Sequence, residues 1–289
     1  MTAPALARPV TQTVAKPTIG VALDVVLYVL LGVAALVTLS PLLFALSLAF
    51  QGPTLAPSII PDLTRLDWGV FVAVFQREPL LVRWIVNSFV VALAVTAAQL
   101  ATSSLAAFAL VYLQFPGKTV LFFVFLATLL IPWEATVVPN YLLVTSLHWK
   151  DSYAGLIAPF LAGGFGIFLL RQHFLTIPRE LYEAAVMDGC GRMRFLWKVL
   201  LPLSRPALGT LAIYTFLNTY NQYYWPLLVT DSAVWRTTQV GITFFRSSEV
   251  QLFNLQMAAT LVVTLPTLLL VIVGLRQLVR GLTAGAVKG

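Results

Sequence analysis

The chain has 289 residues, of which 59% are hydrophobic and 10% charged, and its mean hydropathy is +0.89. Soluble domains are about half apolar and about one quarter charged, so this composition excludes a soluble globular enzyme. A membrane-crossing helix needs about 20 apolar residues, so length and composition predict one all-α polytopic membrane domain. The single cysteine, Cys190, excludes an internal disulfide framework, and the two histidines are too few for a metal cluster without carboxylates.

Six apolar stretches reach the length that a membrane crossing needs. They cover residues 25–50, 85–112, 119–144, 153–173, 206–230 and 256–279. The first is longer than the apolar region of a signal peptide, so it is predicted to be a retained span. The predicted organisation is a six-span domain over 25–281 between tails 1–24 and 282–289, with outer loops 51–84 and 231–255 and an inner loop 174–205.

The distribution of basic residues predicts the orientation of these spans. With both termini inside, twelve Lys and Arg residues fall on the cytoplasmic side and six on the outside. This bias follows the positive-inside rule and predicts a multi-pass protein of the plasma membrane with cytoplasmic termini. It also accounts for the net charge of +7 without nucleic acid as a partner. Residues 1–20 are expected to be disordered, and Trp68 and Trp84 to lie at the membrane interface.

The inner loop 174–205 is too long for a simple turn and too amphipathic for a disordered segment. Thr176 is predicted to cap a short helix that has Pro178 in its first turn. Leu181, Ala184 and Ala185 are spaced to share one face of that helix. The two alanines would leave a flat patch that another surface can approach closely.

A second short helix is predicted around residues 192–200, after a break at Gly189 and Gly191 and before a stop at Pro202. Glu183, beside the alanine patch, offers a carboxylate suited to a guanidinium on a partner. The alternative is an amphipathic helix that only rests on lipid headgroups. The composition of the loop leaves both interpretations open.

The loop also carries a motif with a known resemblance. The run from Glu183 to Gly189 (Glu-Ala-Ala-Val-Met-Asp-Gly), followed by Phe195, Leu201-Pro202-Leu203 and Pro206, resembles the EAA motif of ABC importer permeases. The segments 151–156, 171–172, 221–227 and 281–289 are similar to carbohydrate permeases of the maltose G-subunit type. The resemblance extends over nearly the whole chain from residue 25. One departure is Cys190, where the family usually has alanine.

This resemblance implies an all-α, six-span type I ABC importer permease of the MetI-like fold. The implied partners are a homologous second permease, a cytoplasmic ABC ATPase dimer, an external solute-binding protein and membrane lipid. In such importers the EAA helix docks into an ATPase cleft, and ATP-driven closure switches the permease pair between inward-facing and outward-facing states. The implied coupling residues are Glu183, Ala184, Ala185, Asp188, Gly189 and Pro202.

The chain is predicted to bind no cofactor itself, with ATP and Mg²⁺ used by the partner ATPase. Residues 117–119 (Gly-Lys-Thr) resemble the end of a phosphate-binding loop, but Tyr112 stands where that loop needs its first glycine. His148 and His173 are predicted on opposite sides of the membrane and cannot form a dyad. Glu134 is expected to be solvated near the outer interface. The sequence therefore predicts no catalytic residue and no metal site.

The fifth span offers the candidate substrate path. Its amides and one indole recur at the spacing of a single helical face: Asn218, Asn221, Gln222 and Trp225. Amides pair with sugar hydroxyls, and an aromatic face stacks on a pyranose. The alternative is that these residues bond neighbouring helices to one another.

Two further features complete the predicted transport machinery. Gly163, Gly164 and Gly166 favour close helix packing over a broken helix that lines a cavity. In the resembling family the outer loop 231–255 reaches toward the solute-binding protein, so Phe245, Arg246 and Glu249 are the docking candidates; the alternative is an ordinary exposed loop.

The sequence thus predicts the permease subunit of a bacterial ABC importer that moves a sugar or oligosaccharide by alternating access. A permease for glycerol-3-phosphate or a glycerophosphodiester is the alternative, although no basic cluster for phosphate is evident in the spans. An intramembrane enzyme would need two facing ionisable residues at one depth, and the spans offer none.

Overall fold

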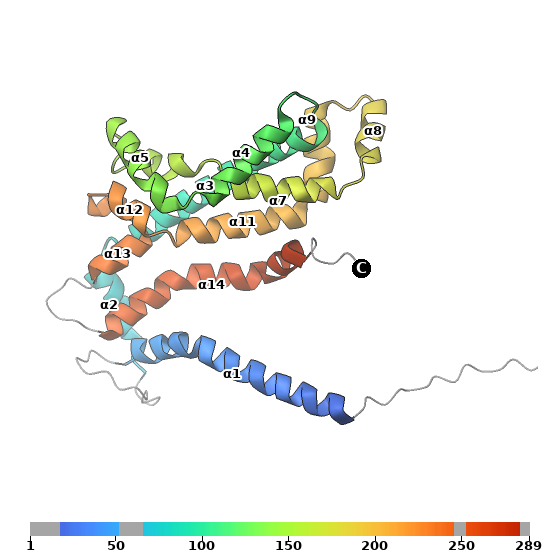
Figure 1. Ribbon diagram of the computed structural model, residues 1–289. Coiled ribbons are helices and arrows are strands. Elements are labelled where there is room, and N and C mark those ends of the chain that lie inside the picture. Colours follow the sequence, from blue (N-terminus) through green and yellow to red (C-terminus); the bar gives the residue numbers. More distant parts are fainter. Residues whose placement is uncertain (1–17, 52–65, 246–252, 284–289) are drawn as a thin grey trace, which may run out of the picture.

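The computed structural model describes residues 18–51, 66–245 and 253–283, and within these ranges the chain is helical and contains no strand (Figure 1). This confirms the all-α prediction. The elements are α1 (Thr18–Ala49), α2 (Gly69–Arg77), α3 (Leu81–Tyr112), α4 (Lys118–Leu130), α5 (Trp133–Ser146), α6 (Tyr153–Ile157), η1 (Ala158–Phe160), α7 (Gly164–Leu175), α8 (Glu180–Met187), α9 (Arg192–Phe195), the π-helical η2 (Leu196–Leu200), α10 (Leu201–Leu203), α11 (Arg205–Tyr220), α12 (Tyr224–Val229), η3 (Ala233–Trp235), α13 (Thr238–Phe245) and α14 (Phe253–Thr283).

The long helices lie side by side, with α3 near the middle of the bundle and α1 at its edge (Figure 1). α3 packs along α7 and α11, α11 packs along α14, and α14 packs along α1. In the most apolar window of α3, 44% of the residues are buried, whereas none is buried in that of α1. Because apolar side chains that face outward need a nonaqueous surrounding, the exposed leucines and valines of α1 suit contact with lipid.

Three helices are long and apolar enough to cross a membrane alone, and the number rises to six if each bent helix pair is one span. The count agrees with the six predicted stretches only when each bent pair is taken as one span, and one pair includes residues 192–203 of the predicted inner loop. α4 and α5 meet at 97°, α6–η1 and α7 at 44°, and α9–α10 and α11 at 81°. Pro132 explains the first bend, because the residue before a proline is pushed into extended backbone, and Ile131 has φ −80° and ψ 115°.

Close helix packing around the glycines of the fourth predicted span is confirmed. A Cβ on Gly164 would lie 2.6 Å from the Thr128 hydroxyl oxygen of α4, and one on Gly166 would collide with Ser103 of α3. A Cβ on Gly163 would come within 3.1 Å of the Gln99 side chain. These glycines let α7 approach α3 and α4 more closely than any side chain would allow.

The segment between α1 and α3 differs in part from its prediction. The predicted outer loop 51–84 contains a helix, α2, and the last four residues of the range already belong to α3. Trp68 is 68% exposed, as an interfacial tryptophan would be, but Trp84 is only 2% exposed. The Trp84 indole nitrogen donates to the Ala233 carbonyl at 2.7 Å, so this ring packs inside the protein. At the N-terminus, helix α1 already begins at Thr18, inside the predicted tail.

The inner loop 174–205 forms two short helical pieces, as predicted, but with different ends. Thr176 does not cap the first helix: it ends α7, and its hydroxyl donates to the His173 carbonyl at 2.7 Å. Pro202 does not end the second piece, which continues through η2 to Leu203 and bends at Ser204. Pro202 is the second residue of α10 and lies two residues before that bend.

Candidate coupling loop and membrane cavity

Helix α8 presents Glu183 and Ala184 at the surface of the coupling loop, which is the name used below for residues 174–205. Around them, Leu181, Val186 and Met187 are also exposed, Met187 by 87%. Large exposed apolar side chains of this kind mark a contact surface when they lie outside the hydrocarbon region. Ala185 is half-buried against the protein core, so the predicted patch comprises Leu181 and Ala184 but not Ala185.

The turn after α8 is built by Asp188 and Gly189. Asp188 ends the helix, and Gly189 has φ +70°, the left-handed conformation that closes many helices. The Cys190 N–H donates to the Ala185 carbonyl at 2.8 Å, and the Gly189 N–H donates to that of Val186 at 3.0 Å. These bonds turn the chain, so that α9 lies in contact with α8.

Tyr182 anchors α8 to the bundle, a role that the sequence analysis missed. Its ring lies 5.1 Å from that of Tyr112 at the end of α3 and 5.0 Å from that of Phe195 in α9, measured between centroids. Phe195 is fully buried. A small cleft of about 150 Å³ lies beside this anchor and includes Arg179 and Glu183 among its lining residues. Tyr182, the neighbour of Glu183 in the chain, therefore links α8 directly to the end of α3.

A larger cavity of about 550 Å³ lies among α3, α5, η1 and α11. Its lining consists of amides, hydroxyls and aromatic rings, and none of the lining residues carries a charge: Gln99, Trp133, Phe160, Tyr214, Thr215, Asn218, Thr219, Gln222, Tyr223 and Tyr224. A paired set of amides and rings matches the hydroxyls and apolar faces of a sugar.

The four residues of the predicted substrate path, which we call the substrate stripe, separate into two pairs. Asn218 and Gln222 line the cavity, whereas Asn221 and Trp225 do not. Asn221 donates to the Leu217 carbonyl at 2.9 Å and accepts from Gln239 at 3.2 Å. The prediction of one continuous helical face is wrong, because α11 ends at Tyr220 and a new helix begins at Tyr224.

Pro226 supplies the physical reason for this break. A proline ring clashes with the carbonyl four residues earlier, here that of Gln222, and it lacks the N–H that would bond that carbonyl. The chain therefore leaves the helix near Gln222 and re-enters it in α12. Trp225 then points into the protein, fully buried, with its indole nitrogen donating to the Gly155 carbonyl at 3.0 Å.

The comparisons with known proteins agree with this architecture. The profile of the family described as "Binding-protein-dependent transport system inner membrane component" matches residues 99–279, which is more than half of the chain. The chain belongs to this family. It is therefore a membrane permease subunit of an ABC importer, a class that works with an ATPase and a solute-binding protein.

Named relatives share much of the permease sequence. The permease is 36% identical over 271 residues to the sn-glycerol-3-phosphate transport system permease protein UgpE of Yersinia pestis, covering 90% of this chain and 96% of the relative. It is 40% identical over 198 residues to UgpE of Yersinia enterocolitica, covering 68% and 70%. UgpE of Escherichia coli O1:K1 / APEC is 39% identical over 202 residues, with 69% and 72% covered.

A solved structure shares the fold. The permease superposes with a TM-score of 0.80 on a chain from the crystal structure of a bacterial ABC transporter involved in the import of the acidic polysaccharide alginate. The match covers 91% of this permease and 99% of that chain at 21% identity. This confirms the predicted fold of a type I ABC importer permease.

The remaining candidate residues are placed as follows. Residues Arg246 and Glu249 lie outside the described residues; Phe245 ends α13, but its side chain is not described. Glu134 is exposed in the first turn of α5, and its predicted solvation at the outer interface stays a prediction. Gly117 has φ +78° in the turn before α4, and the Lys118 ammonium donates to the Val111 and Leu113 carbonyls at 3.2 and 3.0 Å. Lys118 thus caps the end of α3, which explains the Gly-Lys-Thr run without a nucleotide.

Gln99 is a cavity residue that the sequence analysis missed. Its amide nitrogen donates to the Phe160 carbonyl at 2.9 Å, and its amide oxygen accepts from the Thr215 hydroxyl at 3.2 Å. One side chain thereby joins α3, η1 and α11 at the cavity wall. A lone glutamine in an apolar span was the available signal, since such residues bond helices or line cavities.

We expect Gln99→Met to lower the thermal unfolding temperature of the purified permease complex. The variant keeps the volume of the side chain but leaves the Phe160 carbonyl and the Thr215 hydroxyl without this partner, at a cost of about 1–3 kcal/mol. Gln172→Met, at an exposed position of α7, is the matched control. Equal unfolding temperatures for the two variants would refute the bridging role.

Proposed function

We propose that this permease moves a neutral sugar or oligosaccharide through the cavity of about 550 Å³. The supporting observation is the chemistry of its lining, which combines the amides of Gln99, Asn218 and Gln222 with tyrosine and tryptophan rings and includes no charged side chain. Burying an ionic solute without opposite charge costs several kcal/mol, whereas hydroxyls pair readily with amides.

The proposed mechanism is alternating access driven through the coupling loop. The exposed carboxylate of Glu183 binds a basic group of the ATPase, and the Tyr182 anchor carries the resulting displacement to α3. Ala184 permits close approach of the ATPase, while Asp188 and Gly189 hold the turn, and Ala185 and Pro202 support α8 and α10. The ATPase is a dimer, and a homologous second permease completes the membrane pair.

The proposed orientation places the coupling loop and both termini in the cytoplasm. The excess of basic residues on that side supports this orientation. The end of the bundle that carries α5, α12 and α13 then faces the solute-binding protein (Figure 1). Phe245, Arg246 and Glu249 are proposed docking residues, since Phe245 ends α13 and the other two come shortly after it in the sequence.

Glycerol-3-phosphate is the second candidate substrate. It is favoured by one observation, the 36% identity over 90% of the chain to relatives named as sn-glycerol-3-phosphate permeases. The uncharged cavity lining favours the neutral sugar. A single measurement separates the two: stimulation of ATP hydrolysis in the complete reconstituted transporter by neutral disaccharides or by glycerol-3-phosphate. Stimulation by glycerol-3-phosphate alone would replace the sugar assignment.

We expect Asn218→Ala and Gln222→Ala each to lower the amount of solute taken up per ATP hydrolysed by about threefold to tenfold, since each loses a hydrogen bond of about 0.5–1.5 kcal/mol to the solute. Uptake and phosphate release are measured together in proteoliposomes that contain the complete transporter. Asn221→Ala is the matched control because Asn221 lies outside the cavity lining. Unchanged uptake per ATP in both cavity variants would exclude this cavity as the path.

A further inference from the structure

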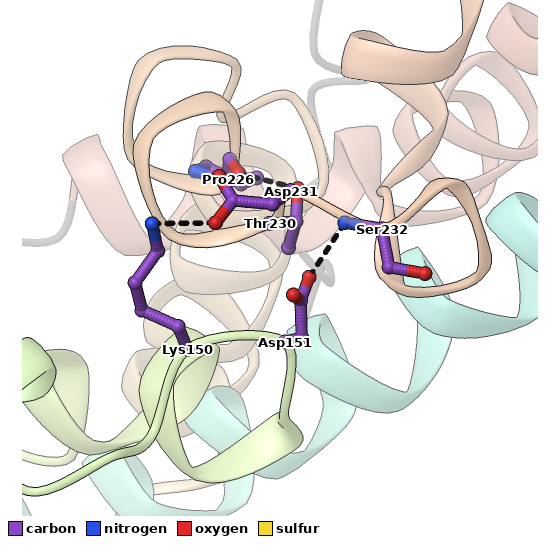
Figure 2. Close-up of polar contacts among 6 residues, drawn as sticks. All are labelled: Lys150, Asp151, Pro226, Thr230, Asp231 and Ser232. Atoms are coloured by element: carbon purple, nitrogen blue, oxygen red, sulfur yellow. Dashed lines mark hydrogen bonds and ion pairs between the residues drawn. The ribbon is translucent and has the colours of Figure 1, made fainter.

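Three contacts join the connection after α5 to the end of α12, and Figure 2 shows the polar side chains involved. We call residues 150–152 and 229–232 the outer junction. The Asp151 N–H donates to the Val229 carbonyl at 2.9 Å, and the Asp151 carboxylate accepts from the Ser232 N–H at 2.9 Å. The Lys150 ammonium lies 2.6 Å from an Asp231 carboxylate oxygen. Thr230 closes the last turn of α12 by donating to the Pro226 carbonyl at 2.7 Å.

Asp151 contributes more to this junction than the neighbouring ion pair. The Asp231 side chain is 69% exposed, and an exposed ion pair contributes about 0–1 kcal/mol. The hydrogen bond to Asp231 raises the pKa of Lys150, so the ammonium stays charged at neutral pH and loses its charge as the pH rises through that raised pKa. Asp151, in contrast, uses both its main chain and its side chain to hold residues 229–232.

The backbone of Asp151 is also specialised. Its φ is +51°, in the left-handed region, where aspartate, asparagine and glycine are better tolerated than other residues. This turn lets the main chain and the carboxylate face the same segment. The following residue, Ser152, caps α6 by accepting from the Gly155 N–H at 3.2 Å. The junction is therefore continuous with α6.

Helix α12 is fastened to α6 a second time, at its opposite end. There the Trp225 indole donates to the Gly155 carbonyl at 3.0 Å. The Trp225 ring also packs edge-on against Trp133 and Phe160, with centroid distances of 5.8 and 6.1 Å. Both of those rings line the cavity, as do Tyr223 and Tyr224 at the start of α12. The position of α12 thus determines where one aromatic wall of the cavity stands.

We propose that Asp151 is a positioning residue for transport, which holds α12 and thereby the aromatic wall formed by Tyr223, Tyr224, Trp133 and Phe160. This inference rests on the proposed function, in which the solute passes along that wall. Asp151 touches no solute itself. It acts through the hydrogen bond to Ser232, which keeps the short helix from shifting when the solute-binding protein docks nearby.

The test measures the wall directly, separately from transport. A reporter cysteine replaces Tyr224, which is 52% exposed, in a Cys190→Ala background of the complete reconstituted transporter. A thiol-reactive maleimide then reports how accessible the wall position is. We expect Asp151→Gly, which suits φ +51° but lacks the carboxylate, to change the labelling rate about tenfold through loss of a charge-assisted hydrogen bond. Asp151→Asn keeps an acceptor and restores the original rate.

A second variant removes the same bond from the other side. Ser232 has φ −76°, which suits proline, and Ser232→Pro deletes the N–H that Asp151 accepts. We expect Ser232→Pro to reproduce the effect of Asp151→Gly, and the double variant to add nothing further. Asp67→Gly is the matched control. The Asp67 carboxylate also accepts a backbone hydrogen bond, from the Gly69 N–H at 2.8 Å, but Asp67 does not line the cavity.

The outcomes separate the two claims. Labelling is measured in the cysteine reporter protein, and uptake per ATP is measured in a protein that keeps Tyr224 and carries the same Asp151 substitution. A changed labelling rate together with reduced uptake per ATP supports the positioning role. An unchanged labelling rate in both Asp151→Gly and Ser232→Pro overturns it, whatever happens to transport. If the labelling rate changes but uptake per ATP stays constant, and uptake per ATP is also unchanged in Asn218→Ala and Gln222→Ala, the proposed substrate path itself is refuted.

Discussion

We expect Glu183→Ala to reduce strongly both uptake and the stimulation of ATP hydrolysis by the solute-binding protein, while the chain still inserts and assembles. Glu183 is exposed on α8, so its removal leaves the permease core intact. In the proposed ATPase interface the same change would leave a basic partner buried without its carboxylate, at a cost of about 2–5 kcal/mol, and we expect stimulated activity to fall more than about tenfold. Both quantities are measured in proteoliposomes with saturating binding protein.

The matched control for this prediction is Glu180→Ala. Glu180 is also exposed and lies one turn before Glu183 on the same helix, so it controls for the loss of one negative charge near the ATPase. We expect its activity to stay close to that of the unmodified transporter. Wild-type stimulation and uptake in Glu183→Ala would show that this carboxylate does not couple the permease to the ATPase.

Replacing Gly166 by valine strongly lowers the stability of the permease. A Cβ at this position collides with Ser103 of α3 and comes within 3.1 Å of Leu211 of α11, so α7 must move away from both helices. Overpacking of this kind costs about 1–3 kcal/mol, and the lost helix contacts add to that. The measurement is the thermal unfolding temperature of the purified protein in detergent, together with its yield from membranes.

Gly32→Val is the matched control for this effect. It makes the same change of residue type within α1, but a Cβ on Gly32 meets nothing within 4 Å. We expect its unfolding temperature to differ little from that of the unmodified protein. If Gly166→Val is as stable as Gly32→Val, the close crossing of α3, α7 and α11 is not required for the fold.

The predictions from sequence succeed where a property depends on a short run of residues. The apolar stretches locate the helices, because the cost of burying polar backbone in lipid is a local sum over about 20 residues. The coupling loop is recognisable because its charges and its glutamate–alanine run stand close together in the chain. The same locality explains why the turn at Asp188 and Gly189 could be anticipated: a glycine supplies the left-handed backbone it needs.

The substrate stripe shows where such reasoning fails. Helical periodicity assumes an unbroken helix, but Pro226 interrupts it and turns Trp225 away from the cavity that Asn218 and Gln222 line. Trp84 fails similarly: an interfacial site is typical of tryptophan, yet its indole bonds to Ala233, 149 positions later. A pairing over that distance leaves no trace in the residues beside it.

By itself, the sequence determined that this protein is an all-α membrane permease, where its apolar helical stretches lie and which loop carries the EAA motif. Only the tertiary structure decided how the helices bend, which side chains share the cavity, and which distant residues Gln99 and Asp151 bind. Gln99 reaches Phe160 and Thr215 across 61 and 116 positions, and Asp151 reaches Ser232 across 81. The physical reason is that hydropathy is set residue by residue, whereas these hydrogen bonds exist only after distant helices have packed together.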